Sequence, residues 1–548
     1  MLQPFIAYAR DPHRLRRFTS ASLIAAFTPL WLMHHNYFGK RYIAVDKAHE
    51  KLGPIVRIAP NHISFADPAA YKEIYGHGTP AIKDEWYDNL AAGNPSMATA
   101  TDKTVHSQKR RNLSNVFSPK EVVVMEPRIN ILTHKLLHAL KKKSQGEMLS
   151  SADGYAVVDG AFDLRPWINM FSFDAMGSMC WSSDFGFLEK GDDNCFARTA
   201  EGSVIPVHAM ETFHVGVAFT TLLAHLPLQW YKLGRRVFKK TWSGQCAENF
   251  GSMTRFKVME RMSTPPVGRD LFSHFPVQAT EKRPIPMQMP EIIVENQVML
   301  SAGSDTTQSA LTYTMFLLAA KPDKQRALRE ILEKTLPAEE VKGLVASYNS
   351  LKNIPYLKAC IDESMRLYAP IGFGLPRRTL GEGATIAGHH IPGGVTISAP
   401  VYTIQRNEKL FHNASKCIPE RWLPEDPDTT EEERRNLKDY YLPFSLGGRA
   451  CIGRNLAYMQ MSLVVSAMVL AFDWELAKPG FEIVPKERFI FNSGPLPVKA
   501  RPRVEIVQVF CYENHEYHFE NGSNFRHKNL RSVLLYMSSL CCVKVVRD

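Results

Sequence analysis

The sequence predicts a mainly α-helical fold with small, segregated β-sheets, arranged as one large domain of the α+β class. Helical periodicity dominates from about Lys120 to Leu332, and short β-type segments occur only near the start and after Leu351. No fixed-period repeat and no Gly-Pro-Ser linker divides the 548-residue chain. Because 45% of the residues are hydrophobic and 22% are charged, a large core is available, and disorder and a polytopic membrane protein are excluded.

The net charge is +11 at pH 7, because 66 lysines and arginines outnumber 55 aspartates and glutamates. This balance favours an anionic surface, an acidic protein partner or nucleic acid, without choosing among them. The 9 cysteines are too few for a disulfide scaffold and none lies in a CxxC pair, which favours a reducing compartment.

Residues 1–40 are basic and apolar, and this pattern predicts a segment that associates with a membrane surface. Several arginines precede an uncharged stretch from Phe18 to Gly39. Pro29 interrupts this stretch, and its fully apolar part, Phe18–Met33, is shorter than the roughly 20 residues that a membrane span needs. An interfacial helix is therefore expected rather than a spanning one.

The first regular elements are expected after this segment. Two short strands, Ile55–Ile58 and Ile63–Phe65, flank a turn, and Asp67 caps a helix that runs to Tyr75. The later elements expected from the pattern are a helix over Leu357–Tyr368, strands over Ala384–His389 and Val395–Ser398, and a final helix over Arg454–Leu470.

The stretch Phe444–Gly453, directly before the final helix, is the most informative part of the sequence. Backbone N–H groups and the helix dipole stabilise a thiolate at Cys451, which makes this cysteine a candidate metal ligand or nucleophile. Gly447 permits a tight turn, Gly453 permits close approach of a flat ligand, and Arg449 is placed to pair with an anionic group. The alternative is a buried structural cysteine.

A long apolar helix is predicted over Glu291–Ala320, with polar residues and a glycine in its middle, at Ala302–Thr307. Such residues are costly in a buried helix unless it opens locally to hold a ligand or water. The alternative is that Thr306 only bonds to the carbonyl four residues earlier.

Two charged pairs have ordinary explanations when taken alone. Glu363 and Arg366 stand three residues apart on one helix, which is typical of a surface ion pair. His106 and Arg110 stand four residues apart in a basic cluster, which is typical of a solvated helix face.

Taken together, these motifs resemble the cytochrome P450 family. The haem-binding loop of that family has the pattern Phe-x-x-Gly-x-Arg-x-Cys-x-Gly, and the chain matches it in full with Phe444, Gly447, Arg449, Cys451 and Gly453. The resemblance implies the cytochrome P450 fold, with the long helix lying over the haem. It also implies haem b (iron protoporphyrin IX), held by the thiolate of Cys451 as the axial iron ligand, and O2 as co-substrate.

The same resemblance gives roles to residues of the long helix. Ala302–Thr307 is similar to the oxygen-binding motif of the family, in which Asp305 and Thr306 would deliver protons to dioxygen. Ala302 and Gly303 would adjoin the haem, and Gly303 would leave room for dioxygen.

The resemblance also implies residues that hold and support the haem. Arg449, Arg377, His106 and Arg110 would hold its propionates, with Arg378 as the alternative to Arg377. Arg421, from the stretch Pro419–Trp422, would join Glu363 and Arg366 in a buried charge network that fixes the haem loop.

The function implied is a haem-thiolate monooxygenase that inserts one atom of dioxygen into a small apolar organic substrate. Pro60–His62, Ala66–Pro68 and Ile74–Gly78 resemble the group that contains the fungal benzoate para-hydroxylases, which implies an aromatic or polycyclic substrate. A haem-thiolate isomerase or dehydratase, and a non-enzymatic haem-binding protein, are the alternatives. The Asp305–Thr306 pair argues against both.

The chain contains no Rossmann or P-loop fingerprint, so electrons must come from outside. The resemblance implies NADPH-cytochrome P450 reductase as the donor, with cytochrome b5 as a second one, and a monomer at the cytoplasmic face of the endoplasmic reticulum membrane. Nucleic acid is not an expected partner.

The resemblance covers most of the chain, from Ile55 to about Val504. We therefore expect the membrane-associating segment at 1–40, the haem domain at 41–507, and an extension at 508–548 that has no family counterpart and packs poorly. Loops expected to contact substrate are Gly78–Thr101, Ser203–Leu233, Ile371–Gly374 and Asn492–Pro495.

Overall fold

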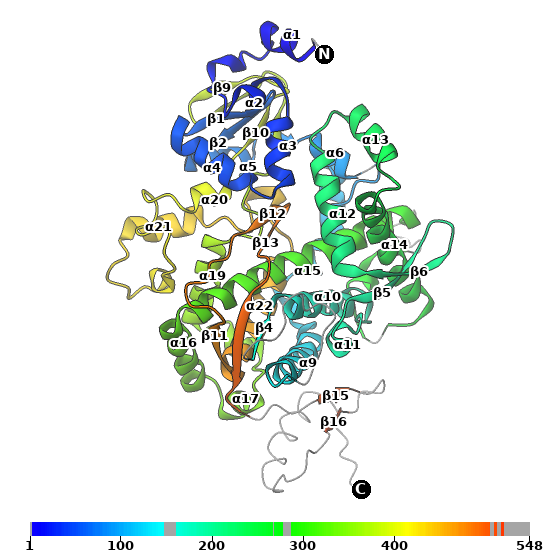
Figure 1. Ribbon diagram of the computed structural model, residues 1–548, viewed down its shortest axis with the longest axis vertical. Helices are drawn as coiled ribbons and strands as arrows, with labels where there is room; N and C mark the ends of the chain where they lie inside the picture. Colours follow the sequence, from blue (N-terminus) through cyan, green and yellow to red (C-terminus); the bar gives the residue numbers. More distant parts are fainter. Residues whose placement is uncertain are drawn as a thin grey trace.

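The computed structural model describes residues 3–91, 93–146, 160–266, 268–277 and 286–504, and the backbone of the short strands β15 (Val509–Cys511) and β16 (Tyr517–Phe519). Helices make up most of this part, and the sheets are small and separate, as the sequence predicts (Figure 1). Apart from the backbone of β15 and β16, the extension expected at 508–548 lies outside the described residues.

The largest sheet has five strands, in the order β1-β2-β10-β7-β3. Its members are β1 (Ile55–Ala59), β2 (His62–Phe65), β10 (Thr396–Ser398), β7 (Arg377–Thr379) and β3 (Ala81–Lys83). Only the pairing of β2 with β10 is parallel. This sheet therefore joins the start of the chain to its last third.

The remaining strands form hairpins and one three-stranded sheet. The sheet contains β11 (Phe472–Leu476), β14 (Pro497–Pro502) and β4 (Ala161–Asp163), and the hairpins are β5 (Asn194–Arg198) with β6 (Val204–His208), β8 (Ala384–Ile386) with β9 (His389–Ile391), and β12 (Lys486–Arg488) with β13 (Ile490–Asn492). The single strand expected at Ala384–His389 is thus a hairpin. The chain reverses there because Ala387 and Gly388 adopt left-handed backbone conformations, with φ of 46° and 76°.

The main core lies where four helices pack together, namely α9 (Glu126–Ser144), α10 (Arg165–Trp181), α15 (Met289–Ala320) and α22 (Arg454–Ala471). The two long helices predicted from the sequence, over Glu291–Ala320 and Arg454–Leu470, correspond to α15 and α22. Nearly every side chain of α22 after Leu456 is buried, which explains why its sequence is apolar on all sides.

The other helices surround this core. In the first half of the chain they are α4 (Arg41–Leu52), α5 (Pro68–Tyr75), α6 (Trp86–Ala91), α7 (Lys103–Ser114), α8 (Pro119–Val123), α11 (Phe187–Lys190), α12 (Ala209–Leu223), α13 (Leu228–Val237) and α14 (Trp242–Ser263). In the second half they are α16 (Pro322–Thr335), α17 (Ala338–Gly343), α18 (Tyr348–Leu351), α19 (Pro355–Leu367), α20 (Val401–Ile404) and α21 (Glu431–Tyr440). The predicted Asp67 cap is present, since its carboxylate accepts a hydrogen bond from the Ala69 N–H at 2.7 Å.

The N-terminal segment is broken into three short helices rather than one interfacial helix. They are α1 (Gln3–Arg10), α2 (Leu23–Phe27) and α3 (Leu30–Tyr37), and Pro29 stands at the start of the last one. Residues of this segment also extend the sheet, because Arg57 of β1 donates its N–H to the Thr19 carbonyl at 2.9 Å. Among the described residues, no helix has the length and apolar character to cross a membrane.

Candidate active site

The turn Phe444–Gly453 holds Cys451 immediately before α22. The Cys451 N–H donates to the Phe444 carbonyl at 2.8 Å and closes the loop. Gly447 has φ +68°, and a Cβ built on it would overlap the backbone of Tyr75 and Gly76, so only glycine fits where the turn packs against the end of α5. The predicted tight turn at Gly447 is therefore present.

Cys451 faces a cavity of about 270 Å³ that separates the turn from α15. Of the residues predicted for the site, the cavity is lined by Phe444, Arg449, Cys451, Gly453, Ala302, Gly303 and Thr306. The sulfur thus does not point into packed side chains. The cavity and the Ala302–Thr307 stretch lie where the sequence places them.

Opposing influences act on the Cys451 thiol. Burial raises its pKa, while the N–H of Gly453 and the positive charge of Arg110 lower that pKa. Arg110 is fixed beside the cysteine because its guanidinium donates to the Ala450 carbonyl at 2.8 Å. Burial outweighs the other two influences, so the pKa of the Cys451 thiol is raised overall, and Arg110 and the Gly453 N–H are the groups that would stabilise an ionised sulfur there.

Helix α15 passes the cavity without opening. The hydroxyl of Ser304 donates to the Leu300 carbonyl at 2.6 Å, and that of Thr306 donates to the Ala302 carbonyl at 2.5 Å. Because both hydroxyls find acceptors within the helix, the helix does not need to open to satisfy them. It is continuous, and the expected local opening is absent. Thr306 both makes this bond and lines the cavity.

Gly303 has a packing role that its place in the motif did not indicate. A Cβ built on Gly303 would overlap the Met176 side chain of α10. The glycine therefore lets α10 approach α15, and both Gly303 and Met176 line the cavity.

Asp305 turns away from the cavity lining. Its carboxylate accepts a hydrogen bond from His214 Nε2 of α12 at 2.9 Å, and both side chains are largely buried. No sequence motif pointed to His214, because it belongs to a different helix 91 positions earlier.

The predicted propionate partners gather on one side of the cysteine turn. Arg449 donates to the Ala100 carbonyl at 2.6 Å, and Arg377 donates to the Tyr87 hydroxyl at 3.4 Å. Burial and the neighbouring cations, with Arg449 the strongest, lower the pKa of His106 to about 3, so this imidazole is neutral at pH 7. Burial together with Arg377 lowers the pKa of Arg449 to about 10.

Of the alternatives Arg377 and Arg378, the former is buried in this cluster, and the latter pairs with Glu85 on the surface. Lys83, which the sequence reading did not single out, lies in the same cluster, because the charges of Arg377 and Arg449 both act on it.

These residues fit a flat anionic cofactor with a metal at its centre. The cavity is mostly apolar, a sulfur lies on one wall, and a cluster of buried cations lies beside it. A Cβ built on Gly453 would meet nothing nearer than the Cys451 sulfur at 4.0 Å, so open space borders the cysteine.

The expected charge network is present and fully buried. Both Arg366 Nε and Arg366 Nη2 donate to the Glu363 carboxylate at 2.8 Å, and Arg421 Nε reaches it at 3.1 Å. Trp422 adds a bond that a phenylalanine could not make, since its indole N–H donates to Glu363 at 3.0 Å. The tryptophan at this position therefore satisfies one more carboxylate lone pair.

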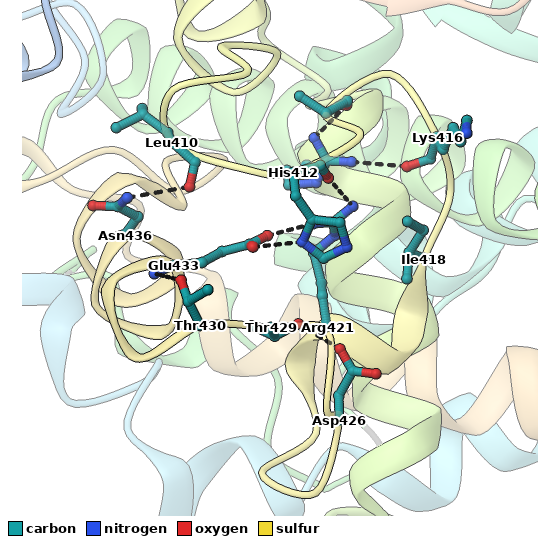
Figure 2. Close-up of polar contacts among 12 residues, drawn as sticks. Leu410, His412, Lys416, Ile418, Arg421, Asp426, Thr429, Thr430, Glu433 and Asn436 are labelled. Carbon is teal, nitrogen blue, oxygen red and sulfur yellow. Dashed lines mark hydrogen bonds and ion pairs between the residues drawn. The ribbon is translucent and has the colours of Figure 1, made fainter.

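Two further residues extend this network, and the sequence reading missed both. Figure 2 shows the Glu433 carboxylate between Arg421 and His412, with an ion pair to Arg421 and a contact of 2.5 Å to His412 Nδ1. Glu433 stands in the run Glu431–Glu433, which is typical of a solvated helix start, and only the fold shows that its third member is buried.

Of the four loops expected to contact substrate, two reach the cavity. Met97 comes from Gly78–Thr101, and Ile371 and Phe373 come from Ile371–Gly374. Glu295 of α15 also lines the cavity, but its carboxylate is occupied by the Met97 N–H at 2.9 Å and by Lys109 at 3.0 Å. It anchors the loop that carries Met97.

Comparison with known proteins identifies the family of the chain. The family model described as Cytochrome P450 matches residues 25–500. Benzoate 4-monooxygenase bphA of Aspergillus niger is 28% identical over 498 residues, which cover 88% of this chain and 92% of the relative. Cytochrome P450 monooxygenase FCK2 of Fusarium pseudograminearum is 30% identical over 481 residues, which cover 87% and 79%.

Among solved structures, the crystal structure of a cytochrome P450 (CYP102L1) superposes with a TM-score of 0.69 at 18% identity, covering 89% of this chain and 99% of that one. At this identity the likeness concerns the fold. The match of the family model to most of the chain shows that the protein belongs to the cytochrome P450 family, and is thus a monooxygenase that uses haem with a cysteine thiolate ligand and O2 as co-substrate.

Proposed function

We propose that this cytochrome P450 oxygenates a small apolar substrate with an aromatic or polycyclic skeleton, and that Cys451 is the thiolate ligand of its haem. The observation that carries the proposal is the apolar cavity between the Cys451 turn and the Ala302–Thr307 segment of α15. One wall supplies the only cavity-lining thiol among the described residues, and the opposite wall supplies a hydroxyl.

When bound, haem would supply the redox chemistry that activates dioxygen, so that one of its oxygen atoms can be inserted into the substrate. The chain positions this group: Arg449 and Arg377 would hold its carboxylates, and Arg110 would hold the turn that carries Cys451. Neutral His106 would donate an N–H to the same carboxylates.

Thr306 and Asp305 would serve proton delivery. The Thr306 hydroxyl lines the cavity, and because its own hydrogen is donated to the Ala302 carbonyl, its lone pairs remain available to accept a hydrogen bond from a proton-donating group. Asp305 is the preceding residue and is hydrogen-bonded to His214. Its carboxylate would take up a proton on the side that faces His214 and pass the proton toward Thr306.

The substrate class follows from the wall opposite the turn. Met97, Val298, Met299, Ile371 and Phe373 are apolar, and the one acidic residue, Glu295, is already bonded to Met97 and Lys109. Apolar walls of this kind favour hydrophobic molecules. The similarity to a benzoate 4-monooxygenase is consistent with a substrate that contains an aromatic ring.

Electrons would come from NADPH-cytochrome P450 reductase, with cytochrome b5 as a second donor. Exposed Lys103 and Arg111 lie on α7, which borders the cysteine turn through Arg110, and exposed Lys120 lies on α8. Phe117, between the two helices, accepts a hydrogen bond from Asn455 at the start of α22. A cationic surface on this side would attract an acidic flavin or haem domain.

The protein would lie on the endoplasmic reticulum membrane, at its cytoplasmic face. Exposed apolar side chains occur on α2 and α3, including Leu23 and Leu30, and on α13, including Leu228 and Trp230. Figure 1 places these helices at one end of the molecule. Basic residues also lie on α13, a combination that suits an anionic lipid surface.

The test is spectroscopic and isotopic. The reduced, carbon monoxide-bound protein should show the Soret band of thiolate ligation, and Cys451→Ala should lose it, whereas Cys417→Ala, outside the cavity, should keep it. Retention of the band in Cys451→Ala would remove the cysteine from its role. Product formed under labelled dioxygen should contain one labelled atom, which an isomerase or dehydratase would not give.

The substrate class is tested separately by titrating the ferric protein with small aromatic, polycyclic and straight-chain polar compounds. Aromatic or polycyclic compounds should produce a spin-state shift of the Soret band at micromolar concentration. A response limited to the polar compounds would contradict the proposed substrate class.

A further inference from the structure

Lys83 is a buried lysine in the cation cluster of Arg377 and Arg449, and no sequence motif pointed to it. It ends strand β3 and is only 9% exposed. Its ammonium donates to the Ala98 carbonyl and lies 4.3 Å from the centre of the Tyr87 ring. An ammonium group has three N–H donors, and in the described structure the Ala98 carbonyl is its one hydrogen-bond acceptor.

The sheet register places Lys83 beside a second buried cation. Strand β3 pairs with β7 so that Lys83 stands directly opposite Arg377, and like charges in opposite positions destabilise a sheet. Arg377 is 3% exposed and also faces Tyr87, to whose hydroxyl it donates. The fold therefore forces two cations together in a buried place.

In the described part of the chain the charges of this cluster are only weakly compensated, because Asp102 acts on Arg449 without forming an ion pair with it. Within it, Lys83, Arg377, Arg449 and Arg110 form no ion pair with a carboxylate, and their hydrogen bonds go to backbone carbonyls or to the Tyr87 hydroxyl. Burial, reinforced by Arg377 and Arg449, holds the pKa of Lys83 well below its usual value. Buried charges without partners are costly, so such a cluster is expected where an anion binds.

We infer that Lys83 is a further ligand of the cofactor, donating to a haem carboxylate together with Arg377 and Arg449. The inference rests on the proposed haem site, and it adds a cation from strand β3 to the partners expected from the turn, α7 and β7. Arg449 lines the cavity directly, whereas Lys83 does not line it but stands opposite Arg377 in the sheet, close enough for the charges of Arg377 and Arg449 to act on it. The haem carboxylates would supply the negative charge that the cluster lacks.

Substitutions of Lys83 can separate its proposed role as an anion ligand from a structural role, in which it only donates a hydrogen bond to the Ala98 carbonyl. In Lys83→Gln an amide N–H can still donate to the Ala98 carbonyl, but the charge is lost. In Lys83→Arg the charge is kept. Lys51→Gln is the matched control, because Lys51 is exposed on α4 and its loss changes the net charge by the same amount.

The first measurement is the rate at which the ferric holoprotein loses haem to excess apomyoglobin. Lys83→Gln should lose haem about tenfold to a hundredfold faster than the native protein, the loss expected for one charged hydrogen bond. Lys83→Arg should remain within about threefold of native, and Lys51→Gln should not differ from it. Native-like haem retention in Lys83→Gln would overturn the inference.

The second measurement reads the carboxylates themselves and needs only folded holoprotein. The propionate bending vibration in the resonance Raman spectrum should shift in Lys83→Gln and Lys83→Arg but not in Lys51→Gln. If Lys83→Gln does not accumulate, Lys83→Arg alone decides, since an unshifted vibration in that variant would overturn the inference.

The two proposals fail in different ways. Absence of the thiolate Soret band in the native protein would remove the haem site that Cys451 is proposed to hold. A normal thiolate band, combined with unchanged haem loss and an unshifted propionate vibration in the Lys83 variants, would remove only the role of Lys83.

Discussion

At the scale of single residues, Asp305 depends on His214. The carboxylate proposed for proton delivery does not line the cavity, and within the described part of the chain it is hydrogen-bonded to the imidazole of His214 on α12 at 2.9 Å. His214 therefore fixes the direction of Asp305 and is a positioning residue in the proposed relay.

Replacing His214 tests this dependence. His214→Phe should lower kcat about tenfold and change the pH profile of kcat, because Asp305 loses the group that orients it, whereas His214→Gln should retain most of the rate. Steady-state product formation across a range of pH checks the prediction. His208→Phe serves as the control, since His208 forms a similar 3.0 Å pair with Asp193 on the surface. An unchanged pH profile in His214→Phe would contradict the dependence.

The residues that a contiguous motif contains could be predicted, and those that the fold brings in could not. Cys451, Arg449 and Thr306 lie in two short stretches whose spacing is informative, and all three line the cavity. Lys83 and His214 stand alone in ordinary sequence. Their importance arises only from pairing with Arg377 and Asp305, which are far away along the chain.

At the scale of elements, α21 contributes a buried charge to the network beneath the turn. Thr430 caps this helix by accepting the Glu433 N–H at 3.2 Å, and a glutamate in that position commonly bonds back to the cap. Here the Glu433 side chain instead points toward Arg421 and His412 (Figure 2). The sequence indicates the start of a helix but not which way its third residue faces.

This arrangement makes Glu433 more important for stability than its neighbours. Glu433→Gln should lower the free energy of unfolding by about 2 kcal/mol, because Arg421 is left buried with less compensation. Glu432→Gln, on the exposed face of the same helix, should change it by less than about 0.5 kcal/mol. Urea denaturation of both variants measures the difference, and equal values would show that the Arg421 contact contributes nothing.

At the scale of the whole molecule, the fold class and the long helices could be predicted because their apolar residues repeat with a clear period. Helix α15 and helix α22 begin and end within two residues of the expected bounds. The β5–β6 hairpin was missed, because its strands are short, partly exposed, and lie in a region dominated by helices. For the N-terminal segment, the sequence predicts an interruption at Pro29 but not its division into separate helices.

Buried histidines make the stability of the molecule depend on pH. His49 is a good example, because its Nδ1–H donates to the Gly53 carbonyl at 3.0 Å and its Nε2 accepts from the Ser64 hydroxyl at 2.8 Å. Burial lowers the pKa of His49 to about 4. Between about pH 6.5 and pH 4, His49 therefore binds a proton in the unfolded chain, where its pKa is ordinary, but not in the folded protein.

Stability should accordingly fall as the pH drops through this window, by up to about 1.4 kcal/mol per pH unit from His49 alone, and show no further change from this residue below about pH 4. In His49→Gln the curve should be flatter, while His77→Gln, at an exposed position, should follow the native curve. Urea titrations at several pH values test this. Parallel curves for native protein and His49→Gln would rule it out.

The parallel pairing of β2 with β10 has a consequence for biosynthesis. His62 and Ser398, which bond across that pair at 2.7 Å, are separated by 336 positions. A ribosome adding about 5–20 residues each second needs roughly 20–70 s to cover that distance. During this interval the edge of β2 that pairs with β10 is unpaired. We therefore expect the nascent polypeptide to bind chaperones at its first strands until the last third of the chain has left the ribosome.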